Sequence, residues 1–423
     1  MKRLNYFYFV LFILLFASCK DDDNSVNNTI SYPEKAVLNK RDVIANLGSG
    51  VSVYNGGFGS SIASNEPGVF YALTDRGPNI DGVNSNEKVF SNPNFVPQIA
   101  KFKLSGDSLK FEKIILLKDE TGKNLSGLPN PQGIGGTGEK PINLNGNVLN
   151  YDEKGIDPEG LAIAKDGTFW ISDEYGPHII HFDANGNTIE RINPFGNGLG
   201  GRKIPPVYKY RRPNRGMEGL TLTKDENYLV GMMQSPLLNP DKSVQKTSKT
   251  VRILFYDIKS GAAKEYIYIL ESTSTAVSEI VALTNNTFLV LERDGNTPGA
   301  DQNNFKKIYK IDVTNATNVT TNDENGKMIN GKTIEQLTVD ELIASGITPV
   351  KKEEVFDIMS IPNYPHDKPE GVVVINSKTI AIINDDDFGV QGTGTYQQKL
   401  MPLLGNKPDM NILYFVKLTK DLY

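Results

Sequence analysis

Two short phrases recur together along most of this 423-residue chain, one built around a glutamate and one ending in acidic residues. Self-similarity at a long period predicts a repeat architecture, in which one supersecondary unit is copied several times. The four paired copies lie at residues 157–161 with 170–174, 217–220 with 228–230, 278–281 with 289–294, and 369–372 with 381–386. A fifth copy, at residues 58–62 with 70–76, lacks the glutamate. The repeat constrains the fold and the functional site together, because it also carries the acids.

Each repeat alternates short apolar runs with turn residues. In the copy that starts at Asp157, the runs 161–164, 168–172 and 179–182 are separated by Asp-Gly and other turn-forming pairs. Short β-branched and aromatic runs joined by such turns indicate an antiparallel meander. Copied around a ring, this unit predicts an all-β protein, a β-propeller of five or six four-stranded antiparallel blades around a central channel.

The spacing of the glutamates predicts where the repeats are interrupted. The first two intervals are 59 and 61 residues, but the last, from Glu279 to Glu370, is 91. The excess lies at residues 315–351, where a capping box from Thr338 to Glu341 predicts a short helix in an insertion on a blade edge. Residues 121–150 are rich in Gly, Pro and Asn, and form either a long loop or a degenerate sixth blade.

The end of the chain predicts how the ring closes. Residues 412–416 are expected to be the third strand of the last blade. A strand near residues 35–43 would complete that blade and remove an exposed sheet edge.

The acids of the two phrases are expected to meet at one channel mouth. The glutamate begins one strand and the acid of the second phrase ends the next, so both lie at the same sheet edge. Crowded carboxylates need a counter-charge, and Ca²⁺ accepts about six to eight oxygen ligands in loose geometry. We therefore expect a divalent metal, most favourably Ca²⁺, with ligands among Glu159, Glu218, Glu279, Glu370, Asp75, Glu292 and Asp385. The alternative is that each glutamate caps its own blade and the aspartates form turns.

Other side chains at the predicted mouth are candidates for catalysis and substrate binding. Asp173 and Glu174 end the second phrase of their copy, and His178 follows them as a candidate acid or base. Arg76 and Arg293 each follow an acid of the second phrase, and Arg215 lies in a basic loop at residues 202–215. Guanidinium groups suit bidentate capture of phosphate or carboxylate, although a solvated basic loop is an equal alternative for Arg215.

The N-terminus has the pattern of an export signal. Lys2 and Arg3 precede a short apolar run at residues 4–16, and small residues precede Cys19. This resembles a lipoprotein signal peptide (residues 1–18) with lipidation at Cys19, followed by an acidic tether (19–34) and the propeller domain (35–423); an ordinary signal peptide is the alternative. We expect a cell-envelope location, as an outer-membrane lipoprotein held in the membrane by its lipid, with surface exposure as one option. Cys19 is the one cysteine, which excludes an intramolecular disulfide.

The phrases together resemble the phytase-like family, also named for esterase-like activity. The matching segments include Thr-Asp-Arg-Gly at residues 74–77, Ser-Asp-Glu-Tyr-Gly-Pro at 172–177 and Asn-Asp-Asp-Asp-Phe at 384–388, besides the glutamate phrases. They extend from about residue 51 to residue 388. The resemblance implies a β-propeller and a hydrolase of phosphate or carboxylic esters.

Three functions remain open on the sequence. The first is a metal-dependent hydrolase of phosphate or other ester bonds, with a small-molecule substrate and metal-bound water as the nucleophile. The second is a sugar-lactone hydrolase of the related propeller type, with a smaller ligand set. The third is a non-catalytic envelope propeller that binds a glycan, peptide or protein. A net charge of −5 argues against nucleic-acid binding, and the chain is expected to be a monomer.

Overall fold

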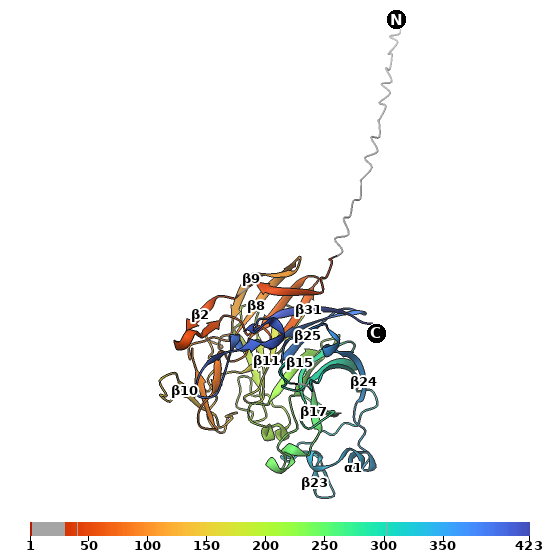
Figure 1. The fold of residues 1–423 in the computed structure, drawn as a ribbon. Helices are drawn as coiled ribbons and strands as arrows, with labels where there is room; N and C mark the ends of the chain where they lie inside the picture. The colour runs from red at the N-terminus through yellow and green to blue at the C-terminus, as the bar shows by residue number, and fades with distance from the viewer. Residues whose placement is uncertain (2–29, 40, 302) are drawn as a thin grey trace. The chain divides into compact units, whose positions relative to one another are not determined.

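The computed structural model describes residue 1 and residues 30–39, 41–301 and 303–423. Tyr32–Tyr423 forms one compact unit, and the fold below is that of this unit (Figure 1). The predicted signal peptide, Cys19 and most of the predicted tether lie outside the described residues. Within those described ranges, no helix has the length and apolar character needed to cross a membrane.

The unit is all-β and contains five consecutive groups of four strands (Figure 1). The second, third and fourth groups are separate antiparallel sheets: β11 (Pro158–Ile163), β12 (Phe169–Asp173), β13 (His178–Phe182) and β14 (Thr188–Ile192); β15 (Met217–Leu222), β16 (Tyr228–Met233), β17 (Thr250–Asp257) and β18 (Ala263–Ile269); β19 (Ala276–Ala282), β20 (Thr287–Arg293), β21 (Lys306–Asp312) and β24 (Lys351–Asp357). The first and fifth groups are β4 (Ser61–Glu66), β5 (Val69–Leu73), β8 (Gln98–Ser105) and β9 (Ser108–Leu116); and β25 (Pro369–Asn376), β26 (Thr379–Asn384), β31 (Ile412–Lys417) and β1 (Lys35–Asn39).

The first strands of the five groups pack against one another in chain order. β4 contacts β11, β11 contacts β15, β15 contacts β19, β19 contacts β25, and β25 contacts β4. Each glutamate phrase lies on one of these first strands, as the sequence predicted. The arrangement is propeller-like, and it brings residues far apart in sequence to the shared ends of the first strands.

The predicted N-terminal strand is confirmed. β1 pairs antiparallel with β31, with Ala36 opposite Leu413, and therefore forms the fourth strand of the last group. The other edge of β1 pairs in parallel with β9, which joins the fifth and first groups into one eight-stranded sheet. Ala36 and Leu38 are buried in the core between them.

Residues 121–150 form a long loop and not a sixth four-stranded blade. Their one strand within the described residues is β10 (Lys140–Asn143), which joins β6 (Asn79–Asp81) and β7 (Glu87–Phe90) in a small sheet. The remaining short pairs are β2 (Val43–Asn46) with β3 (Ser52–Tyr54), β27 (Val390–Gln391) with β28 (Gln397–Gln398), and β29 (Leu400–Met401) with β30 (Lys407–Pro408).

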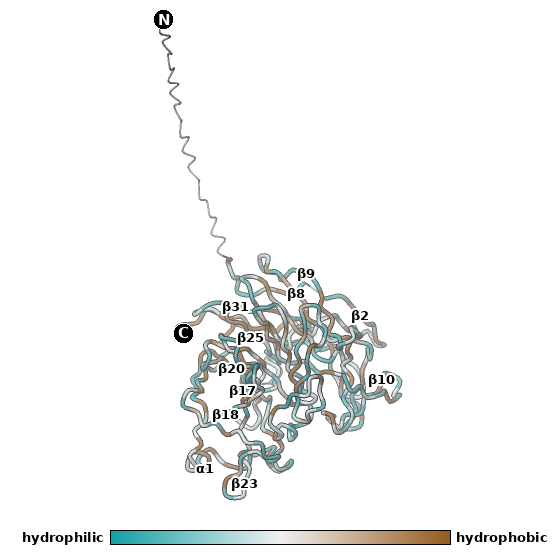
Figure 2. Tube along the Cα trace, turned by 180° about the vertical axis from the view of Figure 1, so that it is seen from behind, coloured by the Kyte–Doolittle hydropathy of each residue, from teal (hydrophilic) through white to brown (hydrophobic). Residues whose placement is uncertain are grey.

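Local sequence explains both the turns and the packing of the strands. Between β11 and β12, Gly167 has a positive φ of 83°, and Asp166 Oδ1 accepts the backbone N–H of Thr168, as a tight Asp-Gly turn requires. Strand residues such as Ile171 and Val290 are buried between adjacent sheets. Figure 2 shows hydrophobic stretches along the strands and hydrophilic stretches in many of the loops that connect them.

The predicted insertion lies between β21 and β24. It contains β22 (Met328–Ile329), β23 (Lys332–Thr333) and the helix α1 (Val339–Ala344). The capping box is confirmed, because Glu341 N donates to Thr338 Oγ1 and Thr338 N donates to Glu341 Oε2. In both views α1 and β23 lie close together (Figures 1 and 2). Leu342 packs with Ile267 of β18, so the insertion rests on the third sheet.

Short 3₁₀ helices occupy several loops: η1 (Gly48–Gly50), η2 (Pro206–Tyr210), η3 (Lys242–Lys246), η4 (Ile334–Gln336), η5 (Ile358–Ser360), η6 (Asp387–Gly389) and η7 (Pro402–Leu404). Two of them place acidic side chains beside basic ones. η6 carries Asp387 into the candidate site, and η4 carries Glu335 into a buried ion-pair network.

Candidate functional site

A cavity of about 450 Å³ lies where β11, β15 and β25 begin. Its wall carries nine carboxylic side chains and five basic ones, which gives a potential excess of four negative charges. The acids are Asp75, Asp81, Asp157, Glu159, Glu174, Glu218, Glu370, Asp385 and Asp387, and the bases are Arg76, Lys88, Arg215, Arg293 and Lys368. Such an excess favours the binding of a cation.

Three of these acids occupy the same place in their strands. Glu159, Glu218 and Glu370 are each the extra residue of a β-bulge, because the residues on either side of each pair with consecutive residues of the neighbouring strand. A bulge re-aims a side chain that regular pairing would place elsewhere. The bulges therefore direct the three glutamates into one cavity from three blades.

The glycine that follows each of these glutamates has a separate role. A Cβ on Gly160 would lie 2.5 Å from Leu220 N, and a Cβ on Gly219 would lie 2.5 Å from Ile280 N. Only glycine permits this approach of the next first strand. The Glu-Gly phrase thus combines a cavity residue with a close-packing residue.

Glu279 lies at the glycine position and not at the glutamate position. In β19 the extra residue of the bulge is Ser278, so the frame of this copy is shifted by one residue. Such a shift moves a side chain to a different environment. Ser61 Oγ donates a hydrogen bond to Glu279 Oε2 at 2.5 Å, and Glu279 lines a separate cavity of about 210 Å³ between the five first strands. The structure therefore does not bring Glu279 to the acidic cavity.

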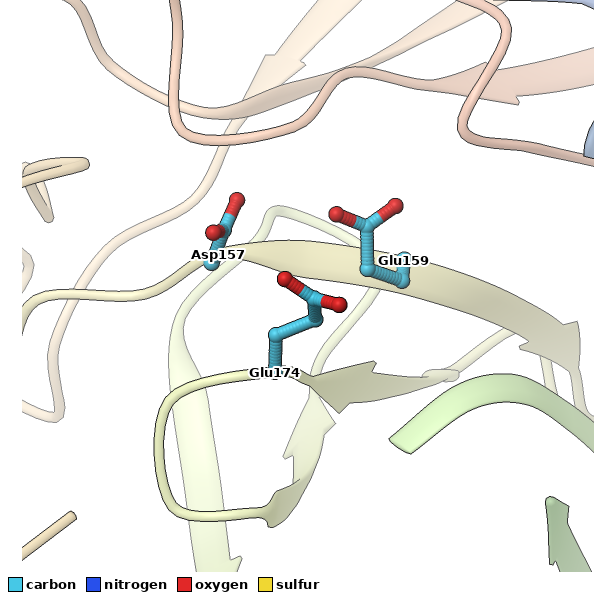
Figure 3. A group of neighbouring side chains, drawn as sticks. All are labelled: Asp157, Glu159 and Glu174. Carbon is cyan, nitrogen blue, oxygen red and sulfur yellow. The ribbon is translucent and has the colours of Figure 1, made fainter. Parts of the chain in front are cut away.

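Asp157, Glu159 and Glu174 form the tightest group of oxygens in the cavity (Figure 3). One carboxylate oxygen from each lies within 4.8 Å of the others. Asp157 and Glu159 come from the start of β11 and Glu174 from the turn after β12, and the three carboxylates converge (Figure 3). Three convergent carboxylates are suitable ligands for a hard divalent cation.

Unsatisfied buried atoms lie beside this group. Glu174 and Glu218 are 3% and 2% exposed, and Glu174 Oε1 and Glu218 Oε2 have no hydrogen-bond partner within the described part of the chain. Buried polar atoms normally have a partner, so two such carboxylate oxygens in one cavity are suited to binding a cation. These carboxylates are therefore suitable ligands for a cation such as Ca²⁺. The buried oxygens support this separately from the number of acids in the cavity.

The ionisation of these acids is strongly perturbed. Burial, and then repulsion from Glu218, raise the pKa of Glu159 well above its usual value. The same causes raise the pKa of Glu174 well above its usual value. Burial, and then repulsion from Glu370, raise the pKa of Glu218 to about 8. The carboxylates are crowded enough to retain protons near neutral pH without a counter-charge.

A second group of acids lies on the same cavity wall. Lys368 Nζ is 3.4 Å from Asp385 Oδ2 and also donates to Asp387 Oδ1. Lys399 Nζ donates to the other oxygen of Asp387 at 2.7 Å. Burial opposes ionisation of Asp387, but Lys368 and Lys399 hold its pKa below the usual value. This group obtains its counter-charge from the chain itself.

The three predicted arginines all line the cavity but differ in their partners. Arg76 forms ion pairs with Glu139 at 3.0 Å and Asp157 at 3.3 Å. Arg293 donates to Glu370 and to Ser278 Oγ. Across the described ranges, the guanidinium of Arg215 makes no hydrogen bond or ion pair. Arg215 is therefore the arginine of this wall that is available to an anionic ligand.

Glu292 lies away from the cavity in a buried network of its own. It accepts hydrogen bonds from Tyr268 Oη at 2.6 Å and Thr275 Oγ1 at 2.5 Å, and it pairs with Lys352 at 2.8 Å. It is fully buried between β20 and the neighbouring sheet. The repeat pattern predicted Glu292 as a metal ligand, but its contacts are those of a structural ion pair.

Replacing Glu292 by Gln should therefore destabilise the protein without altering cation binding. Loss of the charge leaves Lys352 without its buried partner, and we expect about 2 to 3 kcal/mol lower free energy of unfolding. Glu354→Gln is the matched control, because its pair with Lys307 is exposed and should contribute under about 1 kcal/mol. Urea unfolding with and without calcium measures both; a calcium response lost only in Glu292→Gln would contradict the structural role.

Asp173 and His178 lie behind the cavity wall and not on it. Asp173 Oδ1 accepts the backbone N–H groups of Asp157 and Tyr175, each at 2.9 Å, and Oδ2 pairs with Arg191. Burial raises the pKa of Asp173 to about 6. His178 Nε2 is 3.2 Å from Asn130 Oδ1, and burial lowers its pKa well below the usual value. Of the three predicted catalytic residues, the structure brings only Glu174 into the cavity.

Five charged cavity residues were not predicted, and three of them, Asp157, Asp387 and Lys368, lie close in sequence to predicted ones. Each lies two residues from a predicted one, since Asp157 precedes Glu159, Asp387 follows Asp385, and Lys368 precedes Glu370. Residues i and i+2 of extended chain share a face. The period applies only in part, because Asp387 lies in η6 and Glu159 and Glu370 are the extra residues of bulges.

Comparisons with known proteins agree with the family resemblance. A family model described as phytase-like, esterase-like activity of phytase, matches residues 54–388, which include every acid of the cavity. An uncharacterized secreted protein of Arthroderma benhamiae is 26% identical over 358 residues, covering 72% of this chain and 70% of its own.

Solved structures show only weak similarity. A protein from Lactobacillus plantarum aligns over 87% of this chain and 92% of its own, at 10% identity and a TM-score of 0.34. Virginiamycin B lyase from Staphylococcus aureus aligns over 86% of this chain and 96% of its own, at 13% identity and a TM-score of 0.31. Neither similarity is high enough to carry an argument.

Proposed function

The chain belongs to the phytase-like family, described by the esterase-like activity of phytase, and on this premise we propose that it is a divalent-cation-dependent hydrolase of phosphate or other ester bonds. Family membership suggests a hydrolase. The single observation that most supports cation dependence is the convergence of Asp157, Glu159 and Glu174 beside the unpartnered oxygen of Glu174.

The same group defines where the cation would bind. Asp157, Glu159 and Glu174 would hold it, with Glu218 adjoining from the next blade. Ca²⁺ is the preferred candidate, because it accepts several carboxylate oxygens in loose geometry. When bound, such a cation would polarise a phosphoryl or carbonyl oxygen of the substrate and lower the pKa of a water molecule.

The basic side chains have separate tasks in this proposal. Arg215, whose guanidinium has no partner among the residues that the structure describes, would bind the anionic part of the substrate. Arg76 holds Asp157 in place through their ion pair, and Arg293 holds Glu370. We therefore assign substrate binding to Arg215 and positioning of the carboxylates to the other two.

A lactone hydrolase is the second candidate. The compact oxygen group comes from a single blade, since Asp157 directly precedes β11, Glu159 lies at its start and Glu174 follows β12. This is a smaller ligand set than a ring of glutamates from four blades, and a smaller set is the feature that favours a lactone hydrolase. Both candidates place ester-bond hydrolysis at the same group of oxygens.

A substrate panel tests the proposal. The chain without its leader would be incubated with phosphomonoesters, carboxylic esters and sugar lactones, in calcium and in a chelator. We expect turnover of one class, lost in the chelator and in Arg215→Met when the substrate is anionic. Tight binding of a ligand without turnover would instead favour the non-catalytic propeller.

Cation binding should strengthen as the pH rises. The pKa of Glu159 and Glu174 is raised, so these groups hold their protons to higher pH than ordinary carboxyls and must release them to bind a cation. The apparent calcium dissociation constant should fall by about tenfold per pH unit for each proton released, with the trend continuing towards pH 8, where Glu218 titrates. Calorimetric titrations from pH 6 to 9 measure it. An affinity independent of pH would contradict binding at these carboxylates.

The proposal includes an export route and a closed fold. The relative from Arthroderma benhamiae is named as secreted, and residues 1–18 have a signal-peptide pattern, so we place the chain in the cell envelope with Cys19 lipidated. Fatty-acid labelling of the wild type and of Cys19→Ala tests the anchor.

The contacts from β4 through to β25 and back to β4 support a closed five-bladed propeller. A chain that starts at Arg41, and so lacks β1, should then unfold at a lower temperature.

A further inference from the structure

The two groups of acids in the cavity differ in how their charge is neutralised. The group of Asp157, Glu159 and Glu174 has Arg76 as its nearest ion-paired cation, and Arg76 is shared with Glu139. Two buried oxygens beside it, on Glu174 and Glu218, have no partner in the described part of the chain. Arg76 therefore neutralises this group only in part.

In the second group, by contrast, basic side chains of the protein neutralise the carboxylates. Asp385 and Asp387 both contact the ammonium of Lys368, and Asp387 also contacts Lys399. Glu370, on the same wall, is paired with Arg293. A divalent cation that entered here would have to displace a tethered ammonium and then remain beside it, and both steps are unfavourable for like charges at short range.

We propose that Lys368 takes the place of a second divalent cation, so that the wild-type chain binds one such ion, at Asp157, Glu159 and Glu174. This inference rests on the proposed function, because it assumes that the first group holds a cation. The Lys368 side chain is 33% exposed and lines the cavity, as do both of its acidic partners, Asp385 and Asp387.

The arrangement has a chemical consequence. In two-metal hydrolytic sites, the two ions stabilise charge on the attacking and leaving oxygens together. Here the second positive charge would be the Lys368 ammonium, with a fixed position and no dependence on free calcium. The protein would then need one equivalent of cation for full occupancy, and its calcium titration would show one class of site.

Metal stoichiometry tests this directly. The mature wild-type chain would be dialysed against calcium and its bound metal counted by mass spectrometry, with isothermal titration as a second readout. We expect one ion per chain for the wild type and for Lys368→Arg, which keeps the charge. Lys368→Met should bind two, since Asp385 loses its ammonium partner and Asp387 keeps only Lys399, and calcium should raise its melting temperature more than that of the wild type.

Lys88→Met is the matched control. Lys88 lines the same cavity but pairs with Asp81, and its loss removes one positive charge from the wall without uncovering Asp385. It should still bind one ion. Two ions per wild-type chain, or one ion in a folded Lys368→Met chain, would overturn the inference and leave the proposed function standing. The number of ions bound per wild-type chain tests the inference even if Lys368→Met does not fold. No bound ion in any chain would overturn the proposed function itself.

Discussion

Replacing Glu159 by Gln is expected to weaken calcium binding at least about 100-fold, equivalent to about 2.7 kcal/mol, and to abolish the calcium-dependent rise in melting temperature. Glu159 supplies one of three convergent carboxylates, and the amide that replaces it carries no charge. The substitution keeps the shape of the side chain at the bulge, so folding should be preserved. Isothermal titration and thermal unfolding, each with calcium and with a chelator, measure the two effects.

Glu279→Gln is the matched control, because Glu279 belongs to the same recurrent phrase. The structure places it in the separate cavity, bonded to Ser61, and its substitution should leave calcium affinity within about twofold of the wild type. Equal loss in both variants would mean that a ring of all the repeat glutamates binds the ion. Wild-type affinity in Glu159→Gln would exclude the group in Figure 3 as the site.

The sequence predicted the architecture well because the strongest signals were local. Asp-Gly turns and short β-branched runs specify hairpins wherever they occur, and the period of the repeat extends them to successive blades. The capping box at Thr338 and the N-terminal strand at Lys35–Asn39 were also correct. The turns and the capping box depend on a few neighbouring residues. The N-terminal strand could be predicted because the last blade otherwise had an exposed edge.

The site was less predictable because it depends on register. Glu159 and Glu279 occupy the same place in the recurrent phrase, but the bulge falls on Glu159 in one copy and on Ser278 in the other. The signal that separates them is the next residue, because each bulged glutamate precedes a glycine whereas Glu279 precedes Ile280. Glu292 illustrates a second difficulty, since its partner Lys352 comes from a strand after the insertion, 60 residues further along. Long-range partners decide whether an acid is structural or free to bind a ligand.

The insertion shows such a long-range partnership most clearly. Arg252 on β17 is completely buried, and its guanidinium pairs with Glu265 of β18 at 3.1 Å and with Glu335 of η4 at 2.7 Å. Asn239 also donates to Glu335 Oε2 at 3.1 Å. The network therefore ties the insertion to the third sheet through one side chain.

Arg252→Met should lower the free energy of unfolding by about 3 to 5 kcal/mol, because it leaves two buried carboxylates without a counter-charge. Lys209→Met is the control, since Lys209 of η2 pairs with Glu324 of the same insertion at an exposed site, and this pair should contribute under about 1 kcal/mol. Urea unfolding followed by fluorescence measures both variants.

A compensated variant separates charge from packing. Combining Arg252→Met with Glu265→Gln and Glu335→Gln removes every buried charge of the network, so most of the lost stability should return. If Arg252→Met were as mild as Lys209→Met, the hydrophobic contacts around Leu342 would be sufficient to hold the insertion. If the compensated variant stayed as unstable as Arg252→Met, the shape of the guanidinium rather than its charge would hold the insertion on the sheet. Calcium binding should be unchanged throughout, because none of these residues lines the acidic cavity.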